Sequence, residues 1–310
     1  MFWLWLILGL IILAFSGDAL VRGAVDLSKI LKVSPFIIAG TLIAFGTSAP
    51  ELFVSLNASF KGSPGAALGN ILGSNFANVF LALGMAASIQ AIKLPKNMSS
   101  ADIMVLLICT IAFIFVLLNL SIFSKWFGLI FIITLLIYVF FTLKNSTKNS
   151  IENIDYKNLS IPKSLIIFVL GLLGVILGSE ILVNSAINIF SKYFGVRDAI
   201  IGIGVLAFGT SLPEVATSII AAIKKENSIA IGNIIGSSIF NILAIGGVTL
   251  FLSNPYDIEE TVINIYDLFP FILATLVLVL FYKFKFSITK LYGVFFVIFY
   301  LLWIAFIFLN

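Results

Sequence analysis

Histidine is absent from this 310-residue chain, and cysteine occurs only once. Without histidine, the chain lacks the commonest side chain for proton relay and for binding transition metals. The single cysteine, Cys109, lies in an apolar run, so the sequence predicts neither a disulfide framework nor a thiolate metal site. The remaining chemistry must therefore rest on oxygen-bearing side chains.

Charge is also scarce. Only 10% of the residues are charged, against about 25% in soluble proteins, whereas 61% are hydrophobic and the mean hydropathy is +1.19. This balance predicts a multi-pass membrane protein that contacts lipid. The pI near 9.1 does not indicate a nucleic-acid partner, because the basic residues are spread over short loops. The apolar run that starts at Met1 has no basic segment or cleavage site, so we expect it to be a membrane helix and not a removed signal.

Long apolar runs recur along the whole chain. A helix needs about 20 apolar residues to cross the hydrocarbon core of a bilayer. By that measure the sequence predicts an all-α protein with ten membrane spans, at about 2–24, 34–58, 66–90, 101–120, 126–143, 164–186, 197–222, 228–252, 263–282 and 287–308. The polar stretch 144–163 is the predicted linker between two five-helix halves, 1–143 and 164–310.

The placement of lysine and arginine predicts the orientation in the membrane, because cytoplasmic loops are enriched in these residues. If the N-terminus lies outside, 13 of the 18 basic residues fall in the inner loops. The outer loops then hold only Lys61, Lys125, Lys192 and Arg197, with Arg22 near the inner end of the first helix. We therefore expect both termini outside the cell membrane and the central linker in the cytoplasm.

Two copies of one motif carry acidic residues inside apolar spans. Gly46-Thr47-Ser48-Ala49-Pro50-Glu51 returns 163 residues later as Gly209-Thr210-Ser211-Leu212-Pro213-Glu214. Without gaps, 46–78 and 209–241 share 15 identities in 33 positions. Five helices in each half would place the two halves in opposite orientations, which is the inverted-repeat plan of secondary transporters. Because charge is costly in hydrocarbon, Glu51 and Glu214 indicate a functional site.

The residues around each glutamate favour a cation. Thr47 and Ser48 precede Glu51 by four and three residues, which would place all three on one helix face, and the second motif repeats this spacing. Each proline frees carbonyl oxygens one turn earlier. Carboxylate, hydroxyl and carbonyl oxygens form a hard site suited to Ca²⁺ or Na⁺. The alternative is a kinked helix whose glutamate pairs with a buried base, but no span offers a basic residue in its core except Arg22.

A second duplicated segment follows each motif. It begins Gly69-Asn70 in the first half and Gly232-Asn233 in the second, and its polar residues recur every four positions. On its own, the spacing of Gly69 and Gly73 is typical of close helix packing. The duplication of this segment at the same offset favours a contribution to the same cation site. Asp18 and Glu180 occupy matched positions in the first helix of each half, as outer ligands, gating contacts or interfacial residues.

These motifs resemble the alpha repeats of the cation/Ca²⁺ antiporter superfamily, in its Na⁺/Ca²⁺ exchanger branch, over nearly the whole chain. The resemblance implies exchange of three Na⁺ for one Ca²⁺ by alternating access, in a monomer with transported ions but no cofactor. It implies that Glu51 and Glu214 bind Ca²⁺ and that the other ligands are Thr47, Thr210, Ser48, Ser211, Ser74, Ser237, Asn78 and Asn241, with the carbonyls of Ala44 and Ala207.

The resemblance also bears on the coupling ion. The Gly-Thr-Ser opening at Gly46 is similar to the Na⁺ branch and differs from the H⁺-coupled relatives, and the amide of Asn241 stands where K⁺-dependent relatives carry an aspartate. The chain has no long loop like the regulatory loop of animal exchangers. Three alternatives stay open: a H⁺-coupled Ca²⁺ antiporter, a cation channel and an intramembrane enzyme. The enzyme lacks support, because the sequence shows neither a nucleophile–base pair nor an aspartate-rich metal motif.

Overall fold

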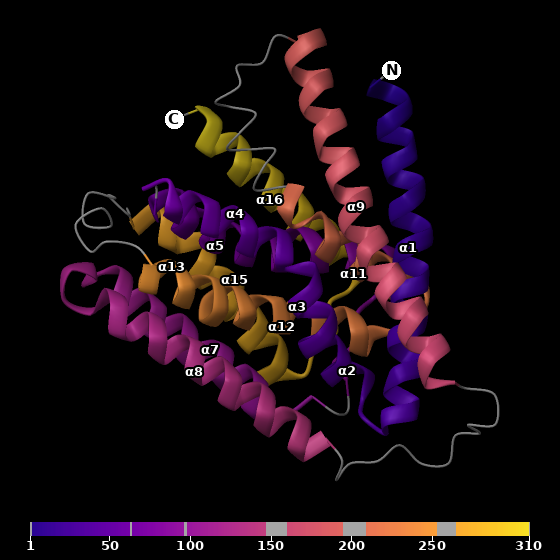
Figure 1. Cartoon of the computed structure of the whole chain (residues 1–310), viewed down its shortest axis with the longest axis horizontal. Coiled ribbons are helices and arrows are strands. Elements are labelled where there is room, and N and C mark those ends of the chain that lie inside the picture. Colours follow the sequence, from indigo (N-terminus) through magenta and orange to yellow (C-terminus); the bar gives the residue numbers. More distant parts are fainter. Residues whose placement is uncertain are drawn as a thin grey trace.

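The computed structural model describes residues 2–62, 64–95, 98–146, 160–194, 209–252 and 265–309. Nearly all of these residues are helical, and the β-structure in these ranges is one antiparallel bridge between Ile92 and Ile288. The all-α prediction is confirmed at this level. In Figure 1 both ends of the chain lie toward the top of the view, whereas α8 ends and α9 begins toward the bottom.

The helices of the first half are α1 (Phe2–Leu31), α2 (Pro35–Ile38), η1 (Ala39–Ile43), α3 (Ala44–Thr47), α4 (Ala49–Phe60), α5 (Pro64–Ala77), η2 (Asn78–Leu83), α6 (Gly84–Ile89), α7 (Ser100–Leu117) and α8 (Leu120–Ser146). Those of the second half are α9 (Ile161–Phe194), α11 (Leu212–Ile223), α12 (Asn227–Phe240), η3 (Asn241–Gly246), α13 (Gly247–Leu252), α15 (Ile265–Phe284) and α16 (Lys290–Leu309). The three η segments are π-helical turns.

Six of the described helices are long and apolar enough to cross a membrane, and a seventh span results if the bent pair Pro35–Thr47 and Ala49–Phe60 is counted as one. Three further apolar helices are shorter, at Leu212–Ile223, Leu268–Phe284 and Lys290–Phe306. Each of the ten predicted spans overlaps one of these helices, but the count of ten stays a prediction. The domain division also stays a prediction, because 147–159 of the linker lie outside the described residues.

Two spans form the centre of the fold. The continuous helices Pro64–Ile89 and Asn227–Leu252 are each 83% buried within their most apolar window, whereas Lys125–Lys144 is only 17% buried. A helix that is apolar all round and buried belongs to a protein core, and one that is apolar and exposed suits contact with lipid. The two central spans are the ones that follow the glutamate motifs, so the predicted site lies at the centre of the molecule.

The long helices α1 and α9 lie side by side and pack chiefly against each other (Figure 1). Small residues permit this contact: a Cβ atom at Gly178 would lie 3.0 Å from the Leu13 nitrogen, and one at Gly9 would lie 3.0 Å from the Leu182 nitrogen. Close backbone approach at glycine is typical of membrane helix pairs. The pair is therefore a distinct two-helix unit beside the central spans.

Each glutamate motif interrupts its helix in the same way. Ser48, with φ −83° and ψ 5°, separates α3 from α4, and Ser211, with φ −83° and ψ 1°, precedes α11. Pro50 and Pro213 then occupy the first turn of the following helix, where proline is tolerated because its missing N–H would have no intrahelical partner. Both prolines lie in the first turn of a new helix, and a bend of 43° between α3 and α4 lies just before Pro50. Span 34–58 is thus one broken helix.

Candidate functional site

Two carboxylates occupy matched positions. Glu51 lies in the first turn of α4 and Glu214 in the first turn of α11, and both side chains are fully enclosed by protein. The N-terminal end of a helix carries partial positive charge, which favours a carboxylate there. The two helix breaks therefore deliver both acidic groups into the interior at positions suited to negative charge.

The two halves bond to each other's carboxylate. The Ser48 hydroxyl donates to Glu214 Oε1 at 2.9 Å, and the Ser211 hydroxyl donates to Glu51 Oε1 at 3.4 Å. Each serine precedes its own glutamate by only three residues, so these reciprocal bonds bring the two carboxylates into one cluster. Ser237 also donates to Glu214 Oε1, at 3.2 Å. The predicted sharing of a helix face with Glu51 is replaced by a bond from Ser48 to the opposite half, because the helix is broken at Ser48.

Several of the residues expected at the site carry buried oxygens with no protein partner. Among the described residues, buried side-chain oxygens without a hydrogen bond include Glu51 Oε2, Glu214 Oε2, Ser74 Oγ, Asn78 Oδ1 and Asn241 Oδ1. A buried polar group left without a partner costs about 1–3 kcal/mol, so several such groups indicate that something else satisfies them. These atoms are the hard ligands that Na⁺ and Ca²⁺ prefer. All five belong to residues that the sequence analysis placed in the site.

The charge of the cluster is limited to these two carboxylates. Within the ranges that the structure describes, no group of three or more histidine, cysteine, aspartate or glutamate side chains gathers in a metal-binding arrangement. Ion pairs in these same ranges involve only Asp18, which bonds Arg22 and Lys224, so neither Glu51 nor Glu214 pairs with a base. The alternative of a glutamate neutralised by a buried base is thus not what the described residues show. A site with two charges and many neutral oxygens suits ions that must also leave.

Thr47 joins the first half to the second beside this cluster. Its hydroxyl lies 3.3 Å from Asn233 Oδ1, to which it donates, and 3.5 Å from both Ser237 Oγ and the Ala44 carbonyl. The Ala44 carbonyl also accepts the backbone N–H of Ser48 at 3.0 Å. Asn233 was noted in the duplicated segment but not placed among the ligands. The structure shows that Asn233 contacts the first half of the chain. The sequence could not predict this contact, because the two residues lie far apart along the chain.

The remaining expected residues divide into three cases. Thr210 is buried at the start of the second motif. Asn78 donates to the Ser238 hydroxyl at 3.5 Å, a partner that the sequence analysis did not single out. Ala207 lies outside the described residues.

Asn78 and Asn241 share a backbone feature as well. Each begins a π-helical segment, η2 and η3, inside an otherwise α-helical span. Single π turns inside α-helices are frequent at functional sites. Nothing in the sequence distinguishes these turns from α-helix. Their appearance at both asparagines supports the placement of these residues in one site.

Asn70 holds the helix that carries Glu51. Its amide donates to the Glu51 carbonyl at 3.2 Å and to the Ser55 hydroxyl at 3.0 Å, which ties α5 to α4. We expect Asn70→Ala to lower the free energy of unfolding by about 1–3 kcal/mol, because buried acceptors lose their donor. Thermal unfolding in detergent measures this loss. Asn119→Ala is the matched control, since Asn119 lies in the turn after α7 and its partly exposed amide donates to the nearby carbonyl of Phe115. An equal loss in both variants would contradict the assignment.

A cavity of about 440 Å³ adjoins the cluster. Pro50 and Phe53 of α4, Glu180 and Val183 of α9, and Thr210 line this cavity. Because Pro50 and Thr210 belong to the two glutamate motifs, this cavity lies beside both motifs. Glu180 therefore lines this cavity.

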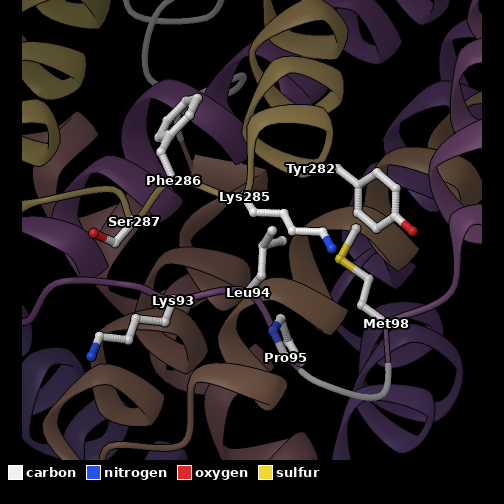
Figure 2. A pocket seen from close by; sticks show the side chains of 8 residues that line it. All are labelled: Lys93, Leu94, Pro95, Met98, Tyr282, Lys285, Phe286 and Ser287. Atoms are coloured by element: carbon white, nitrogen blue, oxygen red, sulfur yellow. The ribbon is translucent and has the colours of Figure 1, made fainter.

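A second cavity, of about 590 Å³, lies between the 93–98 loop and the end of α15. Figure 2 shows that its polar groups do not converge: Lys285 points toward Met98 and Tyr282, whereas Lys93 points away. The bridge between Ile92 and Ile288 holds the two loops together. No residue of the candidate ion site lines this cavity, so we assign it no part in the site.

Comparison with known proteins agrees with this geometry. The family model described as "Sodium/calcium exchanger protein" matches residues 1–144 and 163–309. The chain is 34% identical to the uncharacterized membrane protein MJ0091 of Methanocaldococcus jannaschii, over 96% of this chain and 95% of that protein. It is 30% identical to the sodium/calcium exchanger MaX1 of Methanosarcina acetivorans, over 98% and 97%.

Solved structures extend the match to three dimensions. A structure of the sodium-calcium exchanger NCX_Mj in the presence of Na⁺ superposes with a TM-score of 0.79 at 32% identity, covering 97% of both chains. A TM-score this high over the full length indicates a shared membrane fold. The resemblance drawn from the two glutamate motifs is confirmed, and the chain belongs to the sodium/calcium exchanger family.

Proposed function

We propose that this protein is a secondary antiporter that exchanges three Na⁺ for one Ca²⁺ at a site built on Glu51 and Glu214. The observation that carries the proposal is the reciprocal bonding of Ser48 and Ser211 to the opposite glutamate, beside buried oxygens without protein partners. The family membership supports cation exchange in place of enzymatic chemistry. The complete ligand set is the one expected from sequence, and it includes Ala207, which lies outside the described residues.

Charge balance explains why the two ions exclude each other. Two glutamates give the empty site a charge of −2, which is unfavourable away from water. One Ca²⁺ brings the site to 0, and three Na⁺ bring it to +1, so one net charge crosses the membrane in each cycle. That movement is worth about 2.3 kcal/mol per 100 mV. An empty dianionic site should cross reluctantly, which limits slippage without cargo.

Alternating access is proposed to occur between two inverted five-helix halves that together form ten spans. The matched breaks at Ser48 and Ser211 support the internal repeat. The α1–α9 pair is the proposed moving unit, because these helices pack chiefly against each other. The predicted sidedness, with both termini outside, is compatible with Figure 1, where both ends of the chain lie toward one side of the molecule. A monomer would suffice, since one chain supplies both halves of the site.

Imposed gradients test the proposal directly. The purified protein in vesicles should take up ⁴⁵Ca²⁺ when an outward Na⁺ gradient is imposed, because Na⁺ efflux drives Ca²⁺ entry. The uptake should be electrogenic. An outward K⁺ gradient alone should drive none, since Asn241 adds no third carboxylate. Uptake driven by a pH gradient without Na⁺ would establish the H⁺-coupled alternative instead. Flux that does not saturate at carrier rates would establish a channel.

A further inference from the structure

The ion pairs of Asp18 bridge the two-helix unit and the central helices. Asp18 Oδ1 lies 2.5 Å from Lys224 Nζ, at the end of α11, and Asp18 Oδ2 lies 2.8 Å from an Arg22 nitrogen on α1 itself. Only the bond to Lys224 connects separate elements. The same middle part of α1 packs directly on α11, because a Cβ atom at Gly17 would lie 2.9 Å from Cγ1 of Ile220. Here α1 is held closely against the helix that carries Glu214.

The internal repeat relates the contact between α1 and α11 to the region between α9 and α4. Asp18 corresponds to Glu180, and Lys224 corresponds to Lys61 at the end of α4. Between α9 and α4, however, the structure has the 440 Å³ cavity, lined by Glu180 and Phe53. Neither Glu180 nor Lys61 forms an ion pair with any residue that the structure describes. Asp18 and Lys224 thus form an ion pair, whereas their described counterparts Glu180 and Lys61 do not.

The residues that line the cavity between α4 and α9 have counterparts, through the repeat, at the closed contact between α11 and α1. The α4 and α9 residues of this cavity correspond to Leu212, Pro213, Ala216 and Thr217 of α11 and to Gly17, Asp18 and Val21 of α1. Thr217 is fully buried, and its hydroxyl has no hydrogen-bond partner. Its counterpart, Val54, is apolar. A buried hydroxyl without a partner needs an explanation, and contact with water in another state of the protein would supply one.

We propose that Asp18 and Lys224 form a gate that closes a second ion pathway between α1 and α11, and that Glu180 and Lys61 form the matching gate on the opposite side. The proposal rests on the alternating access of the proposed function. When α1 and α9 move, the pair between Asp18 and Lys224 parts, and Glu180 and Lys61 meet. The structure then represents the state with the α9 side open and the α1 side closed.

The strength of the pair suits a gate that opens in every cycle. The side chains of Asp18 and Lys224 are 40% and 27% exposed, so solvent weakens their attraction. Removing one partner of such a pair changes a two-state population by roughly two- to fivefold. A fully buried pair would lock the protein in one state. The gate therefore biases the equilibrium without preventing the movement.

Cysteine labelling tests the gate. Val21 is fully buried, and its counterpart Val183 lines the open cavity, so Val21→Cys in a Cys109→Ala background should react with a maleimide only when the second pathway opens. In the detergent-solubilised protein, Lys224→Met should raise the labelling rate of Val21→Cys by roughly two- to fivefold. Lys61→Met should lower it by a similar factor, because it weakens the opposite gate.

Lys225→Met is the matched control, since Lys225 is exposed, adjacent to Lys224 and without an ion pair among the described residues. Lys224→Arg should keep the wild-type rate. Equal effects of Lys224→Met and Lys225→Met, or shifts in the same direction for Lys224→Met and Lys61→Met, would overturn the gate. The assay needs no ion exchange, so opposite shifts in a protein that fails to exchange Na⁺ for Ca²⁺ would retain the gate and reject the proposed cargo.

Discussion

Glu51→Gln should abolish Na⁺-driven Ca²⁺ uptake while leaving the fold intact. The substitution keeps the size of the side chain and an oxygen that can accept the Ser211 hydroxyl, but it removes one of the two charges that face the ion. Removing one partner of a buried ionic contact costs about 3–5 kcal/mol. Uptake at low Ca²⁺ concentration should therefore fall by at least about a hundredfold. Initial rates of ⁴⁵Ca²⁺ uptake in vesicles measure the effect.

Glu214→Gln should have the same effect, because Glu214 receives the matching bond from Ser48. The control is Asp102→Asn, which removes a buried carboxylate at the start of α7, where it accepts the Ser99 N–H and the Tyr138 hydroxyl. This variant should lose stability but keep Na⁺-dependent uptake. Uptake at the wild-type rate in either glutamine variant would remove the two-carboxylate site from the mechanism, whatever the control shows.

The sequence could indicate the residues of the candidate site, because the motif that contains each glutamate occurs twice in the chain. Charge within an apolar span, next to proline and repeated at a fixed offset, is improbable unless it is functional. Glu51 was identified in this way, whereas Ser74 and Asn78 came from the second duplicated segment and the family resemblance. The structure places unpartnered atoms of all three in the protein interior. Their role in binding ions stays a prediction that the variants above test.

The sequence could not predict that each serine bonds the glutamate of the opposite half. Helical periodicity places Ser48 beside Glu51, but the break after Thr47 directs the Ser48 hydroxyl to Glu214 instead. Proline indicates a kink without fixing whether the residue before it leaves the helical conformation. The π turns at Asn78 and Asn241 were likewise invisible, because a π turn uses the same residue types as an α-helix. Such details depend on contacts between segments far apart in the chain.

Asp18 shows the same limit for charged residues. Its matched position with Glu180 left three roles open, since composition alone gives no partner. The structure supplies Lys224, which is 206 positions away in the sequence. It also shows that the counterpart faces a cavity. A repeat in sequence thus predicts equivalent positions, whereas the different environments of the two positions in one state come only from the fold.

Gly236→Ala should have the largest effect on folding, because its Cβ atom would overlap the backbone of Gly40 where α12 crosses η1. Overpacking a core usually costs about 1–3 kcal/mol, and a clash with backbone cannot be relieved by turning a side chain. We expect the variant to unfold in detergent at a much lower temperature than the wild type, or to fail to accumulate. Ile231→Val, at a fully buried position of the same helix, should cost only about 0.5–1.5 kcal/mol.

The same crossing sets the distance between the two halves of the candidate ion site. Gly232, one turn earlier, also has no room for a side chain, because a Cβ atom there would lie 3.0 Å from the Ala39 Cβ and overlap the Phe36 carbonyl. The segment that these glycines admit continues into Thr47, which bonds Asn233 on α12. Any Gly236→Ala protein that does fold should therefore have α12 displaced and exchange Ca²⁺ more slowly than Ile231→Val. Wild-type stability and exchange in Gly236→Ala would show that the halves do not meet at this contact.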